Sequence, residues 1–121
     1  MNKVRQVVMQ VRRLSPAEAE IWLLIEAEAV TAATEVRGRL TGPRCVGATT
    51  IEVAYPLKAA PRHEHIPPLS LRVVIPDPSL WEPGRPFVYH AAIELWQDGK
   101  LCDQMEADYG LRMSEKRSLG D

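Results

Sequence analysis

The sequence predicts an all-β domain built as an antiparallel sandwich of about seven strands. Three observations lead to this prediction. Apolar residues recur at every second position in several separate runs, as they do on a strand with one buried face. Turn-forming residues separate these runs, and the chain has ten prolines and seven glycines among its 121 residues. None of the runs has a clear helical period, so no helix is expected.

The segment 15–30 requires a choice between a helix and a strand. Ser15, Pro16 and Glu18 resemble a helix start, with a capping serine, a proline in the first turn and a glutamate three residues after the cap. However, apolar residues occupy every second position from Ala17 to Ala29. On a helix the intervening glutamates would point in four different directions, whereas on a strand they share one side. We therefore predict a strand, with Ser15 in the turn before it.

The other six expected strands have a simpler pattern. They cover residues 4–12, 34–40, 51–55, 69–75, 87–95 and 101–109. Parity places Ser70 and Arg72 on the solvent side of their strand, and Leu101 on the core side of the last strand together with Met105, Ala107 and Tyr109. Asp98-Gly99 between the last two runs is a strong hairpin-turn signal, because both residues tolerate positive φ.

A proline-rich stretch lies between the fifth and sixth expected strands. Prolines 76, 78, 83 and 86 surround Trp81. Proline cannot donate a ladder hydrogen bond, and it keeps the preceding residue extended. We therefore expect a stiff connection that crosses from one sheet to the other, with Trp81 covering the open end of the sandwich. Burying a side chain of this size contributes about 2–3 kcal/mol, so the expected role is structural.

Length and composition limit the class of protein. A chain of 121 residues fits one domain with a two-layer core. Its net charge of −1 gives no electrostatic reason to bind nucleic acid or an anionic membrane. No apolar run approaches the roughly 20 residues that span a bilayer, and the first residues lack a signal-peptide pattern. Cys45 and Cys102 are therefore expected to be reduced thiols in a soluble, cytoplasmic protein.

Two stretches resemble a known family. They are LWEPGRPFVYHAAIELWQDGK at 80–100 and YGLR at 109–112. Together they are similar to the immunoglobulin-like β-sandwich domain of glycoside hydrolase family 2, which includes β-galactosidases, β-glucuronidases and β-mannosidases. The residues that match the family motifs are Leu80, Trp81, Pro83, Pro86, Tyr89, Tyr109, Gly110 and Arg112. Leu111 departs from the phenylalanine that is usual in the aromatic-Gly-Phe-Arg motif.

The resemblance implies a fold, a role and a partner. Residues 1–113 would form the immunoglobulin-like sandwich, and 114–121 would be a disordered tail or a truncated linker to a missing barrel. In the family a separate (β/α)₈ barrel carries the two catalytic glutamates, roughly 5 Å apart. The expected partner is therefore the catalytic barrel of a parent glycoside hydrolase or a neighbouring subunit. No catalytic residue and no cofactor are expected in this chain, and Glu18, Glu20, Glu26 and Glu28 are interpreted as solvent-facing charges.

Other polar residues give weaker signals. His63 and His65, with Glu64 between them, supply only two histidines where a metal site needs three or four ligands, so an exposed loop is expected and no metal. His90 alternates to the outer side of its strand and is expected at the surface. Cys45 has only Arg44 beside it to activate a thiol, which is too little to predict a nucleophile.

Two tryptophans raise alternatives for the function. Trp22 and Trp96 both face outward by parity, so each could dock a partner domain, be partly buried in the ordinary way, or stack a sugar ring. The chain could thus be a stand-alone carbohydrate-binding module instead of an accessory domain. It could also be a small interaction protein, with a homodimer formed through an open sheet edge or the Trp22 side.

Overall fold

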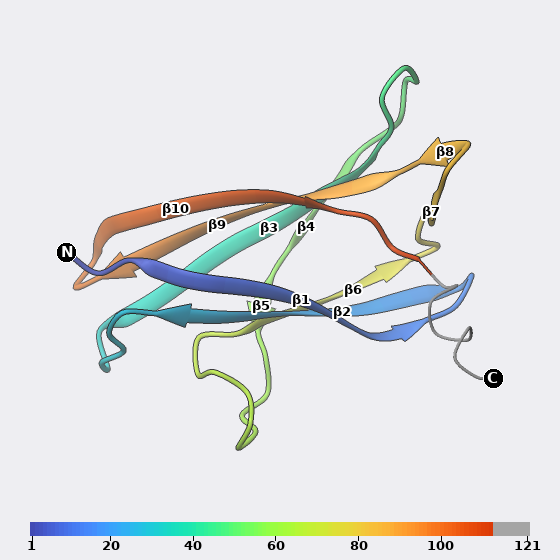
Figure 1. The fold of residues 1–121 in the computed structure, drawn as a ribbon. Helices are drawn as coiled ribbons and strands as arrows, with labels where there is room; N and C mark the ends of the chain where they lie inside the picture. Colours follow the sequence, from blue (N-terminus) through green and yellow to red (C-terminus); the bar gives the residue numbers. More distant parts are fainter. Residues whose placement is uncertain (113–121) are drawn as a thin grey trace.

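A computed structural model describes residues 1–112 of the chain, and these form two four-stranded antiparallel sheets (Figure 1). The strands are β1 (Val4–Leu14), β2 (Glu18–Ala27), β3 (Thr34–Arg44), β4 (Val53–Pro56), β5 (Lys58–Ala59), β6 (Leu71–Pro76), β7 (Trp81–Glu82), β8 (Arg85–Pro86), β9 (Val88–Gln97) and β10 (Lys100–Tyr109). No helix occurs in this part of the chain.

The two sheets stack as the layers of a sandwich. The first sheet has the order β1-β2-β6-β5 and the second has the order β10-β9-β3-β4. In Figure 1 the second sheet lies above the first, and the β7–β8 hairpin lies at the right end of the sandwich. The chain passes from the first sheet to the second between β2 and β3, and again between β6 and β9.

The core consists of the inward-facing residues of both sheets. The fully buried members from the first sheet include Ile21, Leu23 and Ile25 of β2 and Ile75 of β6, and those from the second include Leu40, Tyr89 and Ile93. Their spacing along each strand is two residues, which is the period that the sequence shows. The alternating runs therefore form the facing sides of the two layers.

The predicted all-β sandwich is confirmed. Among the described residues, seven strands are four residues or longer, and they correspond in order to the seven expected strands. The disputed segment 15–30 contains β2 and no helix. The Ser15 hydroxyl accepts hydrogen bonds from the backbone N–H groups of Ala17 and Glu18, so its capping ability serves a tight turn between β1 and β2.

Three expectations about single residues are wrong. Ser70 is buried because it precedes β6, and its Oγ accepts a hydrogen bond from the Ile25 N–H in the core. Leu101 is 40% exposed because a bulge between Leu101 and Asp103 changes the side on which β10 presents it. The strand expected at 51–55 begins only at Val53, so Ile51 lies before β4 and is exposed in the β3–β4 connection.

The expected tail at 114–121 lies outside the described residues. Among residues 1–112 there is no helix of the length and hydropathy needed to cross a membrane.

Candidate functional site

The junction at one end of the sandwich brings together most of the residues that the sequence motifs single out. It consists of the crossover from β6 to β9, with the β7–β8 hairpin inside it, and the last described residues after β10. In Figure 1 the red end of the chain leaves β10 and passes close to β7.

Tyr89 fixes the first half of the crossover. Its ring is buried, and its hydroxyl accepts a hydrogen bond from the Ser79 N–H at 2.9 Å. The ring lies against Gly42 of β3, where an added Cβ would be 2.6 Å from Tyr89 Cδ1. A buried tyrosine needs a partner for its hydroxyl, and the proline-rich crossover provides one. Tyr89 therefore ties the irregular segment to the start of β9 and to β3.

Trp81 fixes the exit of the chain. Its backbone N–H donates to the Leu111 carbonyl oxygen at 2.8 Å. Its indole lies against Gly110, where an added Cβ would be 2.7 Å from Trp81 Cδ1. The Arg112 guanidinium lies over the ring at 3.8 Å from its centroid, in a cation–π contact. The segment 110–112 is thus held along β7 by one hydrogen bond and a stack of side chains.

Leu111 occupies the position at which the motif departs from the usual phenylalanine. Its side chain is fully buried and belongs to the core cluster. An apolar side chain is required there because the position is enclosed by the core, while the flanking Gly110 and Arg112 contact Trp81. Leucine meets that requirement with a smaller volume than phenylalanine.

The remaining motif residues have supporting positions. Leu80 and Tyr109 are partly buried against the core, and burial raises the pKa of the Tyr109 phenol. Pro86 pairs with Trp81 across the β7–β8 hairpin. Pro83 lies exposed in the turn of that hairpin.

The family-model comparison matches residues 3–112 to glycosyl hydrolases family 2. The chain belongs to this family. The match covers both sheets and ends at the arginine that stacks on Trp81. The family assignment inferred from the sequence motifs is therefore confirmed.

Solved structures of a β-glucuronidase and a β-glycosidase share the fold. A β-glucuronidase from Ruminococcus gnavus aligns with a TM-score of 0.61 and 14% identity over 93% of this chain. A β-glycosidase from Bacteroides vulgatus aligns with a TM-score of 0.60 and 18% identity, also over 93% of this chain. This chain spans only 16% and 14% of the length of those chains, respectively. No curated protein matches the sequence.

Trp22 is not the exposed aromatic that strand parity predicts. It is on the outer side of the first sheet but only 6% exposed, because the Arg12 guanidinium lies 4.0 Å from its ring centroid. Its Nε1 donates to Glu20, which also accepts from Arg72. Both hydrogen bonds lower the pKa of the Glu20 carboxyl, and the one from Trp22 has the larger effect. Glu20 is therefore part of a polar network and not a free surface charge.

Trp96 has the same arrangement on the second sheet. Its Nε1 donates to Glu94 at 3.0 Å, and the Arg37 guanidinium lies 4.1 Å from its ring centroid. A sugar that stacks on an aromatic ring needs a free ring face. Arg37 already occupies one face of Trp96, which counts against the carbohydrate-binding alternative. The Glu-x-Trp spacing at 20–22 and 94–96 is the sequence signal that could have indicated both networks.

His90 lies on the outer side of β9, as expected, but it is held by two acids. Its Nδ1 is 2.7 Å from an Asp108 carboxylate oxygen, and its Nε2 is 2.9 Å from a Glu106 carboxylate oxygen. The imidazole is 21% exposed. The hydrogen bond to Asp108, followed by that to Glu106, raises the His90 pKa, while burial and Arg44 act in the opposite direction. The protonated form thus bridges two residues of β10.

This arrangement predicts a pH-dependent stability. The His90 pKa is higher in the folded protein than in the unfolded chain, so the contribution is complete below about pH 6.5 and is lost as the pH rises through the folded pKa. The difference in unfolding free energy between wild type and His90→Gln, measured with urea between pH 6 and 9, should shrink as the pH increases. A constant difference across this range would contradict the prediction.

The remaining candidate residues, two histidines and two cysteines, do not form a site. His63 and His65 lie in an exposed loop between β5 and β6, with ring centroids 6.3 Å apart, and Glu64 contacts only His65. No group of three or more potential metal ligands occurs in residues 1–112. Cys45 and Cys102 are both free.

Proposed function

We propose that this chain is a non-catalytic accessory domain that positions the catalytic barrel of a family 2 glycoside hydrolase. The barrel would lie on the same polypeptide or on a neighbouring subunit. The observation that carries the proposal is the junction at Trp81. There the outgoing segment 110–112 is hydrogen-bonded to β7 and covered by the Arg112–Trp81 stack, so the chain leaves the sandwich in a fixed direction. Domains joined by a flexible linker move relative to one another by default, and a fixed exit would limit that motion.

The size of the match supports the same role. Residues 3–112 account for the family match, and they align with about one sixth of the R. gnavus enzyme. These residues form only β-structure, whereas the resemblance to the family assigns the two catalytic glutamates to a (β/α)₈ barrel. The chemistry would therefore be supplied by residues outside this sandwich.

The first test is hydrolysis by the purified chain. With nitrophenyl β-galactoside, β-glucuronide and β-mannoside as substrates, we expect no release of nitrophenol above the buffer rate. Turnover that persists through several purification steps would end the proposal. Sequencing the gene on both sides of these 121 codons shows whether a barrel is encoded on the same polypeptide.

The second test concerns positioning. The chain is expressed with the family 2 barrel encoded in the same genome, in cis or in trans, and glycosidase activity and complex formation are measured. Trp81→Ala should lower the activity, because it removes the contact that holds 110–112. Trp96→Ala is the matched control, since Trp96 also stacks with an arginine but lies on a sheet face. Equal losses from both variants would contradict a specific role of the junction.

A further inference from the structure

The loop between β3 and β4 is closed at its base by an ion pair. Arg44, the last residue of β3, donates from Nε to a Glu52 carboxylate oxygen at 2.8 Å. The loop projects away from the sandwich in Figure 1 and presents Val46 and Ile51, which are 96% and 89% exposed. Because Arg44 and Glu52 lie at the two ends of the loop, their ion pair joins these ends.

Arg44 also lies close to the acids that bind His90. The Arg44 backbone pairs with β9 two residues before His90, and Asp108 of β10 pairs with His90 from the other side. The Arg44 pKa is raised mainly by the hydrogen bond to Glu52, and further by the charges of Asp108 and then Glu106. Arg44 is therefore shared electrostatically between Glu52 and the acids of β10.

His90 neutralises these acids only while it is protonated. Both nitrogens of an imidazolium donate, so one cation serves Asp108 at 2.7 Å and Glu106 at 2.9 Å. A neutral imidazole has one donor and one acceptor, so it loses one of the two hydrogen bonds together with its charge. Both carboxylates then lack the cation between them.

We propose that His90 is a pH-sensitive switch that controls how firmly the β3–β4 loop is held. When His90 is protonated, Asp108 has its own cation and Arg44 stays on Glu52, so the base of the loop is closed. When His90 is neutral, Asp108 competes with Glu52 for Arg44. The base of the loop then opens more often.

Uncharged residues occupy the other positions around His90. Thr41 of β3 pairs with His90, and Ala54 of β4 pairs with Thr41. The neighbours of His90 on the outer side of β9 are Val88 and Ala92. None of these four residues can neutralise a carboxylate, so competition for the two acids involves the arginines of β3.

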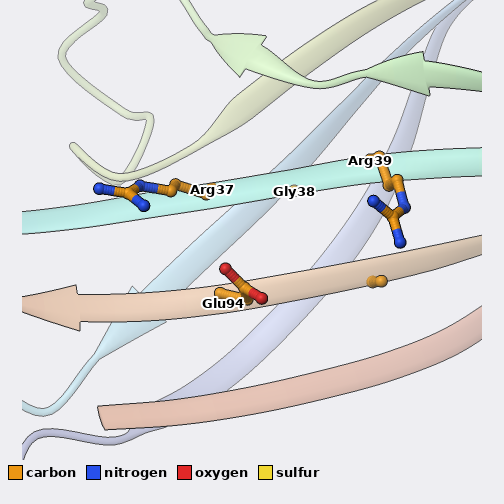
Figure 2. A pocket seen from close by; sticks show the side chains of 5 residues that line it. Arg37, Gly38, Arg39 and Glu94 are labelled. Carbon is orange, nitrogen blue, oxygen red and sulfur yellow. The ribbon is translucent and has the colours of Figure 1, made fainter. Parts of the chain in front are cut away.

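Arg39 supplies a cation for the second acid. It pairs with Ala92 across β3 and β9, and Ala92 pairs with Glu106. In Figure 2 the Arg39 side chain extends from β3 toward β9. Arg39 forms no ion pair with any residue in the described part of the chain. A released Glu106 can therefore turn to Arg39, which leaves Arg44 to Asp108.

The direction of the pH dependence follows from His90. The hydrogen bond to Asp108, and then that to Glu106, raises the His90 pKa above its usual value. The loop should therefore be held at about pH 6.5 and below, and it should loosen as the pH rises further. The switch belongs to the sandwich itself, so it does not depend on whether the chain positions a barrel.

Cleavage by trypsin measures the opening, because trypsin reaches the bond after Arg44 only when the base of the loop is open. Cleavage after Arg62, in the exposed β5–β6 loop, is the internal reference. The ratio of the two rates removes the pH dependence of trypsin, and any effect of the neighbouring His63 is the same in every variant. Between pH 6 and 9 the wild-type ratio should rise about two- to fivefold, the range that a partly exposed ion pair allows.

Three variants separate the parts of the switch. His90→Gln has no imidazolium and should show the high ratio at both pH values. Asp108→Asn removes the competitor for Arg44 and should keep the low ratio at both. Glu106→Gln is the matched control for Asp108→Asn, and it should still show the rise because Asp108 remains.

A wild-type ratio that stays constant between pH 6 and 9 would overturn the proposal. An Asp108→Asn ratio that rises as in the wild type would do the same, because Arg44 would then have no acid of β10 to explain its release. Far-UV circular dichroism of each variant establishes that it is folded.

Discussion

Replacing Gly42 with alanine is expected to lower the free energy of unfolding by about 2–4 kcal/mol. The new Cβ would lie 2.6 Å from Tyr89 Cδ1, 3.1 Å from the Val88 carbonyl oxygen and 3.2 Å from Tyr89 Cα. Two of these three atoms belong to the β9 backbone, so a change of side-chain rotamer does not remove the clash. The Tyr89 ring must also move, which disturbs its hydrogen bond with Ser79. The loss can be measured by urea unfolding of both proteins.

Gly84→Ala is the matched control for this substitution. No atom lies within 4 Å of a Cβ added at Gly84, which lies exposed in the β7–β8 turn. Its effect should stay within about 0.5 kcal/mol of wild type. If Gly42→Ala were equally harmless, the close packing of β3 against Tyr89 would be refuted.

Shortening Leu111 to alanine should cost about 2–5 kcal/mol, because it leaves a cavity under the last described residues. The Leu111 side chain is fully buried in the core. The substitution should also loosen the neighbouring residues Gly110 and Arg112, which contact Trp81. Urea unfolding measures the loss of unfolding free energy. Trp81→Phe is made both in wild type and in Leu111→Ala, so that the difference between the spectra with and without Trp81 gives the fluorescence of this tryptophan alone.

Leu101→Ala makes the same chemical change at an exposed position. Leu101 is on the outer side of β10, so truncation should change the unfolding free energy by less than about 0.5 kcal/mol. Leu111→Met, which keeps the volume, should cost less than about 1.5 kcal/mol. A Leu111→Ala protein as stable as the Leu101→Ala protein would argue against a core role for the motif position.

Alternation of apolar residues was enough to predict the two layers. In β2 the run Ile21, Leu23 and Ile25 faces inward, and in β9 Tyr89, Ala91 and Ile93 do the same. These strands lie inside their sheets with neighbours on both sides, so every inward position is covered. The period-2 pattern is clearest for such strands because one whole side is buried.

The pattern fails where a strand ends or changes register. Leu101 follows the parity of Met105 in the sequence, but the bulge before Asp103 places it on the other side. Ser70 follows the parity of Arg72, yet it lies before the first residue of β6 and turns into the core to accept the Ile25 N–H. Bulges and strand ends depend on pairing with distant residues, which local periodicity does not contain.

The motif residues of the junction were predicted, but their contacts were not. The sequence indicates that Trp81 and Arg112 belong to a family pattern, whereas the stack between them depends on the path of the chain after β10. In the same way, parity correctly places Trp22 on the outer side but says nothing about Arg12, which covers it from the neighbouring strand. Side-chain partners on an adjacent strand follow from register, and register is fixed only by the whole sheet.

The pairing of β2 with β6, and of β3 with β9, has a consequence for how the chain acquires its structure. These contacts join Ile21 to Val73 and Leu40 to Ala91, so each layer is completed only across a loop of roughly fifty residues. Closing such loops makes refolding slow, in the range of milliseconds to seconds. During synthesis on the ribosome, β3 has only β4 beside it until β9 emerges, and an unpaired strand edge of this kind is prone to aggregate.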